Sequence, residues 1–228
     1  MCRVRLRIVG LAALLFAGIS LLGCSVVLAE SIGCQFYYAF SGTAPASTSQ
    51  PWIAAVFEDV TPGTVRLAVT NLNLSGSENV GGFYFNLNPR YSPSALALSI
   101  EGGSGGFLTP AVSLGANTFK ADGDGMYDIL FSFDEGGTDA TRFTANEYLV
   151  WQITGIPTLT AADFAYLSKP AGGAGPFYAA VHVQRIGAGS LSGWIAATDI
   201  SSVSAVPEPT ALTLLVGGLA LMIARRRK

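Results

Sequence analysis

Residues 64–69 read Thr-Val-Arg-Leu-Ala-Val, so large apolar side chains alternate with small or polar ones. A period of two places successive residues on opposite faces of a β-strand, whereas a helix repeats about every 3.6 residues. Val65, Leu67 and Val69 would face a core, while Arg66 would face solvent. The stretch therefore predicts a strand in a sheet with one buried face.

The same alternation recurs along the chain, between clusters of Gly, Pro, Asn and Asp. Further strands are predicted over residues 83–87, 96–100, 127–133, 149–153 and 181–183. About eight short strands in a chain of this length are typical of an all-β, two-sheet β-sandwich of the Ig-like or jelly-roll type. We expect this domain to span residues 30–200.

One short helix interrupts the strand pattern. It is predicted at residues 161–167, because Thr160 is a favourable N-cap and Asp163, three residues later, completes a capping-box pattern. After the domain, residues 201–206 are rich in Ser and are predicted to form a linker.

The C-terminal segment predicts a membrane-inserted signal over residues 207–228. Val206-Pro207-Glu208-Pro209 precedes the uncharged apolar run 210–224, and Arg225, Arg226 and Arg227 follow with a final lysine. The run is apolar on every side, which suits lipid better than a surface groove. As a helix it would span roughly 22 Å against about 30 Å of hydrocarbon, so the terminal arginines would need to snorkel. Those cations are expected to stay in the cytoplasm.

This three-part order resembles the PEP-CTERM sorting signal of Gram-negative bacteria, and the match covers Val206 to Lys228. The resemblance implies that exosortase, a membrane-embedded cysteine transpeptidase, recognises the signal and removes the anchor. It also implies a host that exports polysaccharide. The body is similar to one loose type of PEP-CTERM protein, with Phe83 to Pro89, His182-Val183-Gln184 and Ser192-Gly193-Trp194, but this type implies no activity.

The N-terminal residues 1–29 predict export. Arg3, Arg5 and Arg7 form a basic region before an apolar run, and Val27-Leu28-Ala29 suits cleavage by signal peptidase before Glu30. A second route stays open, because Leu21-Leu22-Gly23-Cys24 resembles a lipoprotein box in which Cys24 would be lipidated. The protein is thus expected to be exported, held transiently in the inner membrane, and then delivered to the cell surface or extracellular matrix.

The composition of the body excludes several partners. Between residues 30 and 205, six Lys or Arg stand against fourteen Asp or Glu, a net formal charge of −8. Nucleic acids and anionic membrane surfaces need clustered positive charge, so neither is an expected partner. Cys34 is the sole cysteine after residue 29 and cannot form an intrachain disulfide. It is expected to be a small buried residue, with pairing between chains as the alternative.

One pattern in the sequence resembles a set of catalytic residues. Gly102-Gly103-Ser104-Gly105-Gly106 matches the form of a nucleophile elbow, and Asp163 and His182 follow in hydrolase order. An elbow needs a strand-to-helix turn, whereas this segment continues towards Pro110 and Gly115, so a flexible loop is expected instead. His182 is the single histidine, which excludes multi-histidine metal sites. No enzymatic activity is predicted.

Two binding sites are candidates. Asp122, Asp124 and Asp128 concentrate carboxylates beside a turn, where a solubilised β-turn is expected and a partial Ca²⁺ site is the alternative. Residues with side chains able to contact glycans form the second candidate: Trp52, Trp194, His182 and Gln184.

The leading hypothesis is a structural or adhesive protein that acts with exopolysaccharide or biofilm matrix. A carbohydrate-binding module, with or without Ca²⁺, is the alternative, and a hydrolase centred on Ser104 and His182 is a third hypothesis.

Overall fold

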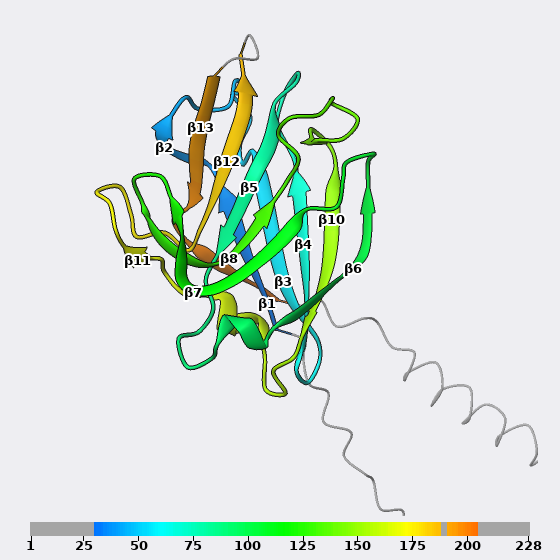
Figure 1. The fold of residues 1–228 in the computed structure, drawn as a ribbon, viewed down its shortest axis with the longest axis vertical. Coiled ribbons are helices and arrows are strands. Elements are labelled where there is room, and N and C mark those ends of the chain that lie inside the picture. The colour runs from blue at the N-terminus through cyan, green and yellow to red at the C-terminus, as the bar shows by residue number, and fades with distance from the viewer. Residues whose placement is uncertain (1–29, 188–190, 205–228) are drawn as a thin grey trace, which may run out of the picture.

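The computed structural model describes residues 30–187 and 191–204 and shows an all-β protein with two antiparallel sheets (Figure 1). The first sheet has six strands in the order β14 (Ile200–Ser204), β1 (Glu30–Phe36), β3 (Ile53–Thr61), β4 (Thr64–Asn71), β10 (Tyr148–Thr154) and β6 (Ala97–Ser104). All of its neighbouring strands pair antiparallel.

The second sheet has eight strands. Six form a continuous order, β11 (Lys169–Pro170), β8 (Gly125–Ser132), β5 (Asn79–Phe85), β12 (Ala179–Ile186), β13 (Leu191–Ala197) and β2 (Tyr38–Gly42). In addition, β7 (Ala111–Ala121) pairs with β8, and β9 (Phe143–Thr144) pairs with β5. The β7–β8 hairpin is strongly bent and curls around one side of the sheet (Figure 1).

The core fills the space between the two sheets and contains many phenylalanine rings. Phe83 and Phe85 of β5 point inward, at 5.6 Å from Phe36 of β1 and 5.3 Å from Phe57 of β3. Trp151 of β10 is buried and packs 5.4 Å from Phe131 of β8. These contacts join the sheets in a sandwich-like arrangement, because each sheet buries alternate residues against the other.

The strands predicted from alternation are confirmed as β4, β5, β6, β8, β10 and β12. In β4, Val65, Leu67 and Val69 are buried, and Arg66 faces outward between Glu58 and Glu101. The Ig-like or jelly-roll type stays a prediction.

The predicted helix 161–167 is wrong in length, because only a 3-10 turn forms at η2 (Ala161–Phe164). A second such turn, η1 (Pro93–Ala95), precedes β6. The expected partners of η2 do meet, since the Asp163 carboxylate accepts the Thr160 backbone N–H and hydroxyl, both at 3.0 Å. The Ala165 N–H bonds to Ala162, and Ser168 N–H bonds to Phe177, so the chain leaves the helical path.

The predicted linker is also wrong, because residues 201–204 belong to strand β14. This strand pairs with β1 in the register Glu30↔Ser204 to Cys34↔Ile200. The domain therefore extends beyond residue 200, and the two ends of the described chain lie side by side in one sheet.

Removing residues 200–204 should destabilise the domain. A chain that stops at Asp199 is expected to lose about 2–4 kcal/mol of unfolding free energy relative to one that stops at Ser204. The reason is that β1 loses its ladder partner and the packed side chain of Ile200 disappears. Urea unfolding measures the difference. Equal unfolding free energies for the two chains would contradict a stabilising role for β14 and support the linker interpretation of residues 201–204.

Cys34 lies in β1 with 1% of its surface exposed, so the expectation of a buried cysteine is confirmed. Burial, together with the negative charge of Asp199, raises the pKa of the Cys34 thiol to about 12. Because the thiolate is the reactive form, this thiol is inert at neutral pH in the folded protein.

A chain that begins at Glu30 should therefore resist thiol reagents. Iodoacetamide at neutral pH is expected to leave Cys34 unmodified in the native protein and to alkylate it in denaturant, as measured by intact mass. Rapid alkylation without denaturant, or a disulfide-linked dimer on a non-reducing gel, would contradict this placement.

Candidate functional site

A β-bulge interrupts β5 at its pairing with β12. His182 pairs with Gly82, but the next residue, Val183, pairs with Val80, so Gly81 is an extra residue on β5. On the other side, Gly82 pairs with Ser132 of β8, and the Gly81 carbonyl accepts the Phe133 N–H at 2.9 Å. Two consecutive residues without side chains thus lie near the middle of the eight-stranded sheet.

An open cavity of about 450 Å³ lies over this bulge on the outer face of the sheet. Its lining consists of Gly81, Gly82, Tyr84, Leu130, Ser132, Phe133, Asp134, Glu135 and His182. The glycines matter, because a methyl group on Gly82 would lie 2.9 Å from Cε2 of Tyr84, and one on Gly81 would clash with the Glu135 carboxylate. Side chains at these two positions would therefore displace Glu135 and Tyr84 from their places in the lining.

The acidic wall of the cavity is a loop that follows β8. The Asp134 carboxylate accepts the N–H groups of Gly136 and Gly137, at 3.1 and 3.2 Å, and the Thr141 hydroxyl at 2.6 Å. The Thr141 hydrogen bond is the main reason that the pKa of Asp134 lies below its usual range, and the two N–H groups and Arg142 add to it. Asp134 thus closes the loop on itself.

Arg142 holds the same loop from beneath. Its side chain is 4% exposed, and its guanidinium contacts the Asp139 carboxylate at 2.9 Å and the Glu135 carbonyl at 3.4 Å. It also donates to the Gly137 carbonyl. With its backbone held in this way, Glu135 directs its carboxylate towards β12.

His182 lies opposite Glu135, with 3.6 Å between its Nδ1 atom and Oε1 of Glu135. Its ring stacks on Trp194 of β13, with centroids 4.6 Å apart and planes 21° from parallel. Burial lowers the pKa of His182 below its ordinary value of 6.5, although the charges of Glu135 and Asp122 act in the opposite direction. The imidazole is therefore neutral at neutral pH.

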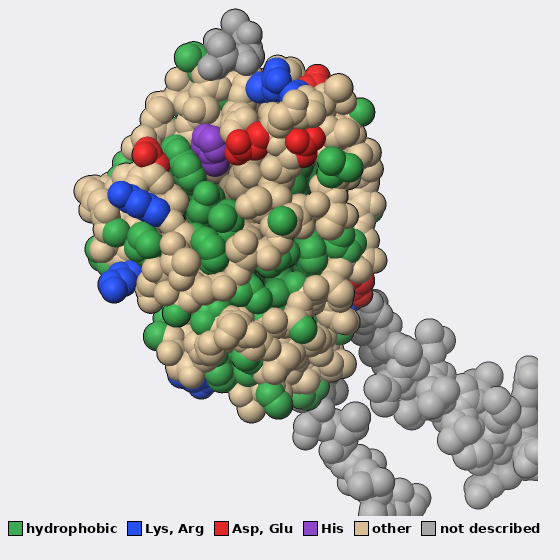
Figure 2. Space-filling model, viewed as in Figure 1, with side chains coloured by type: hydrophobic (Ala, Val, Ile, Leu, Met, Phe, Trp, Pro, Cys, Tyr) green, Lys and Arg blue, Asp and Glu red, His purple; other side chains and the backbone are tan. Residues whose placement is uncertain are grey.

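Aromatic rings continue across the outer face from the cavity. Tyr84 lies 5.3 Å from Trp194 and 5.8 Å from Tyr127, and Trp194 lies 6.3 Å from Phe40. Burial, and then the charge of Glu135, raise the pKa of Tyr84, so its hydroxyl keeps its proton. Figure 2 shows the histidine flanked by acidic side chains, above a broad group of hydrophobic ones.

Of the four residues predicted to contact glycans, His182 lines the cavity, and Trp194 and Gln184 lie next to its lining. His182 of β12 pairs with Trp194 of β13, and Nε2 of Gln184 would lie 3.2 Å from a Cβ atom placed on Gly81. The prediction for Trp52 is wrong as to its exposure. Trp52 is 4% exposed in the core, and its indole N–H donates to the Ser47 carbonyl at 2.8 Å.

The predicted Ca²⁺ ligands do not converge. The buried Asp124 carboxylate binds the hydroxyls of Tyr127 and Ser168. Asp128 accepts the N–H groups of Leu87, at 3.0 Å, and Asn117, at 2.7 Å, and Asp122 is exposed on the turn. Within residues 30–187 and 191–204, no group of three or more His, Cys, Asp or Glu could hold a metal ion. The structure favours the β-turn interpretation.

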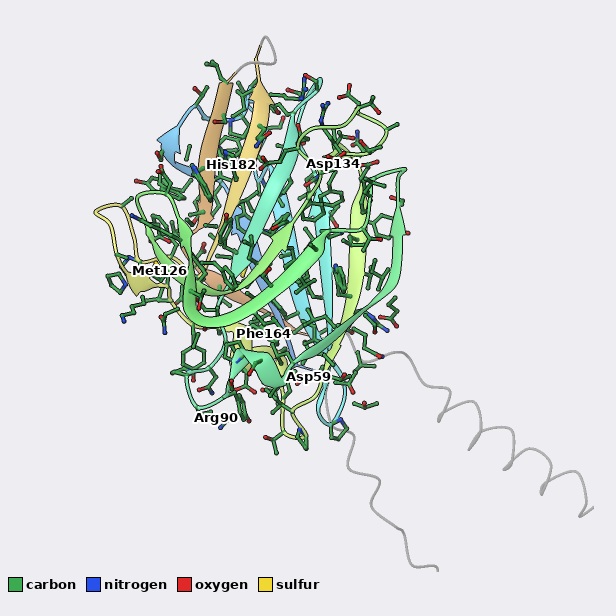
Figure 3. All side chains as sticks on the ribbon, in the orientation of Figure 1. Asp59, Arg90, Met126, Asp134, Phe164 and His182 are labelled. Carbon is green, nitrogen blue, oxygen red and sulfur yellow. The ribbon has the colours of Figure 1, made fainter. Side chains whose placement is uncertain are left out.

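The hydrolase constellation is not assembled. Ser104 ends β6 in the six-stranded sheet, where it pairs with Tyr148, whereas His182 faces the cavity on the other sheet. Asp163 instead binds the Asn88 amide at 2.8 Å and Arg90 at 3.1 Å. Figure 3 places His182 and Asp134 at one end of the molecule, and Arg90, Asp59 and Phe164 at the other.

The predicted sorting residues Val206, Pro207, Glu208, Pro209, Arg225, Arg226 and Arg227 lie outside the described residues, as do the signal segment 1–29 and Cys24. In the part of the chain that the structure describes, no helix is long and apolar enough to cross a membrane.

Glu135, Tyr84 and the two glycines are site residues that sequence reasoning did not find. A Gly-Gly pair inside an apolar strand is itself a signal of a bulge or of a close approach to the backbone. Glu135 offers no such signal, because its position depends on Arg142.

Comparisons of the chain with protein-family models, with curated proteins and with solved structures gave no match.

The single histidine makes the electrostatics of the site directly measurable. The imidazole resonances of His182 should titrate below pH 6.5 in NMR spectra, and Glu135→Gln should lower the midpoint further, because a carboxylate favours the imidazolium. Since the unfolded chain binds this proton more readily, the stability from neutral His182 is present above pH 6.5 and falls below it. A midpoint at or above 6.5 would show that burial does not dominate.

Proposed function

We propose that this chain is an exported, non-enzymatic protein that binds extracellular polysaccharide in the cavity over the β5 bulge. Its PEP-CTERM segment would bring it to exosortase, after a transient stay in the inner membrane. It would then serve a structural or adhesive role with exopolysaccharide or biofilm at the cell surface or in the matrix. The targeting part rests on the sequence features of residues 1–29 and 206–228.

The observation that carries the binding proposal is an open cavity whose lining combines carboxylate, hydroxyl and imidazole groups with an aromatic ring. Gly81 and Gly82 leave room for the Glu135 carboxylate and the Tyr84 ring to pack over the strand backbone in the middle of the sheet, where side chains of β5 would normally project. A volume of about 450 Å³ falls within the range of small-molecule sites, roughly 300–1,000 Å³. It would admit a sugar unit, with the rest of a polymer continuing outside.

The chemistry of the walls suits a hydroxyl-rich ligand. Glu135 offers carboxylate acceptors, Ser132 and Tyr84 offer hydroxyls that both donate and accept, and neutral His182 offers one donor and one acceptor. The Tyr84 ring adds an apolar surface beside these groups, as small-molecule sites commonly provide. Such a mixture can bind the polar edges and the apolar faces of a sugar ring together.

The position of the cavity also fits a surface protein. Glu30 and Ser204 are paired where β1 begins and β14 ends, in the half of the molecule away from His182 and Asp134 of the cavity lining (Figures 1 and 3). A domain held through the residue that follows Ser204 would present this cavity away from its point of attachment.

We also place the two packed sheets in the β-sandwich class.

Replacing Gly82 should weaken binding, because it disturbs the lining of the cavity. In Gly82→Val the new side chain would displace the Tyr84 ring from the lining, so binding to extracted exopolysaccharide, measured by affinity electrophoresis, should fall at least about tenfold. Gly102→Val is the matched control, because Gly102 lies in a strand of the other sheet with nothing within 4 Å of its Cβ position. Equal retardation of folded wild type and Gly82→Val would refute binding at this cavity.

A further inference from the structure

The cavity carries negative charge and no compensating cation in its wall. Its lining contains Asp134 and Glu135 but no lysine or arginine. Asp122, on the β7–β8 turn, is close enough to act electrostatically on His182. Arg142 is buried beneath the loop and is engaged with Asp139 and backbone carbonyls, so its donors do not face the cavity.

The two wall carboxylates differ in what they can offer a ligand. Asp134 accepts three hydrogen bonds from its own loop, so it is already occupied. The Glu135 side chain is 50% exposed, and its Oε1 atom lies 3.6 Å from Nδ1 of the uncharged His182. Glu135 is therefore the carboxylate that a ligand can reach.

The group opposite Glu135 does not neutralise it. Burial keeps His182 uncharged at neutral pH, and its ring is held in place by the Trp194 stack. Tyr84, on the adjacent strand position, also stays uncharged. A negative charge thus faces a cavity bounded by neutral aromatic rings.

We propose that the ligand unit in this cavity is a 2-amino sugar with a free, cationic amino group, as in a partly deacetylated polysaccharide. Its ammonium would donate to the Glu135 carboxylate, and the ring face of Tyr84 would favour the same charge. Uronic acids and sulfated sugars would be repelled by Glu135 and Asp134. This inference rests on the proposed glycan binding and specifies its substrate class.

The experiment compares two oligosaccharides that differ only in the N-acetyl group. The full-length protein, in a detergent without a sugar headgroup, is titrated at near-neutral pH with a glucosamine tetrasaccharide and with its N-acetylated form. Binding is followed by calorimetry. Wild type should prefer the free amine by about tenfold or more, the effect of one charged hydrogen bond. Glu135→Gln should remove this preference.

A control separates the site from the general attraction of a cation to an acidic protein. Glu101→Gln removes the same charge from the outer face of the six-stranded sheet, next to Arg66, and should keep the preference. Loss of preference in both variants would overturn the assignment to Glu135. Equal or better binding of the acetylated form by wild type would overturn the amino-sugar proposal but leave glycan binding standing. If neither form and no native exopolysaccharide binds, both proposals fail.

Discussion

The burial of Phe83 and Phe85 between the two sheets is the contact on which the rest of the molecule depends. Both rings are almost fully buried, and they reach from β5 across to β1 and β3. A slip of β5 by one residue would turn them to solvent, so their burial fixes which residues of this strand face outward. Because Phe83 and Phe85 are held in the core, Gly82 and Tyr84 face outward and line the cavity.

Much of the fold follows from local sequence pattern, but the pairing of the two ends of the domain does not. Alternation predicts β4, β5, β8, β10 and β12, because each has one face in the core. It does not predict β14, whose Ile-Ser-Ser-Val-Ser segment offers little apolar periodicity and is ordered by pairing with β1 at the far end of the chain. The capping pair Thr160 and Asp163 is visible in the sequence, whereas the early end of η2 depends on distant hydrogen bonds.

The residues of the candidate site likewise include some that the sequence pattern predicts and some that it does not. Alternation along β12 places His182 and Gln184 on the outer face, and the adjacent strand adds Trp194. Glu135 depends on a loop held by Arg142, and such contacts leave no periodic trace. The prediction for Trp52 fails for a related reason. Its ring is buried, and its indole N–H donates to the carbonyl of Ser47, five residues earlier. Strand faces can be predicted from sequence, while loops that close over them require the three-dimensional structure.

The pairing of β14 with β1 has a mechanical consequence. Strand β14 ends in the half of the molecule away from His182 and Asp134, so under the proposed function tension between the C-terminus and a bound polymer would run along the strands. Pulling Ser204 along the axis of β14 loads all hydrogen bonds to β1 together, in shear. Pulling Glu30 and Ser204 apart would instead open the same ladder one bond at a time. For the proposed surface role, the load would therefore fall on the β14–β1 ladder in shear.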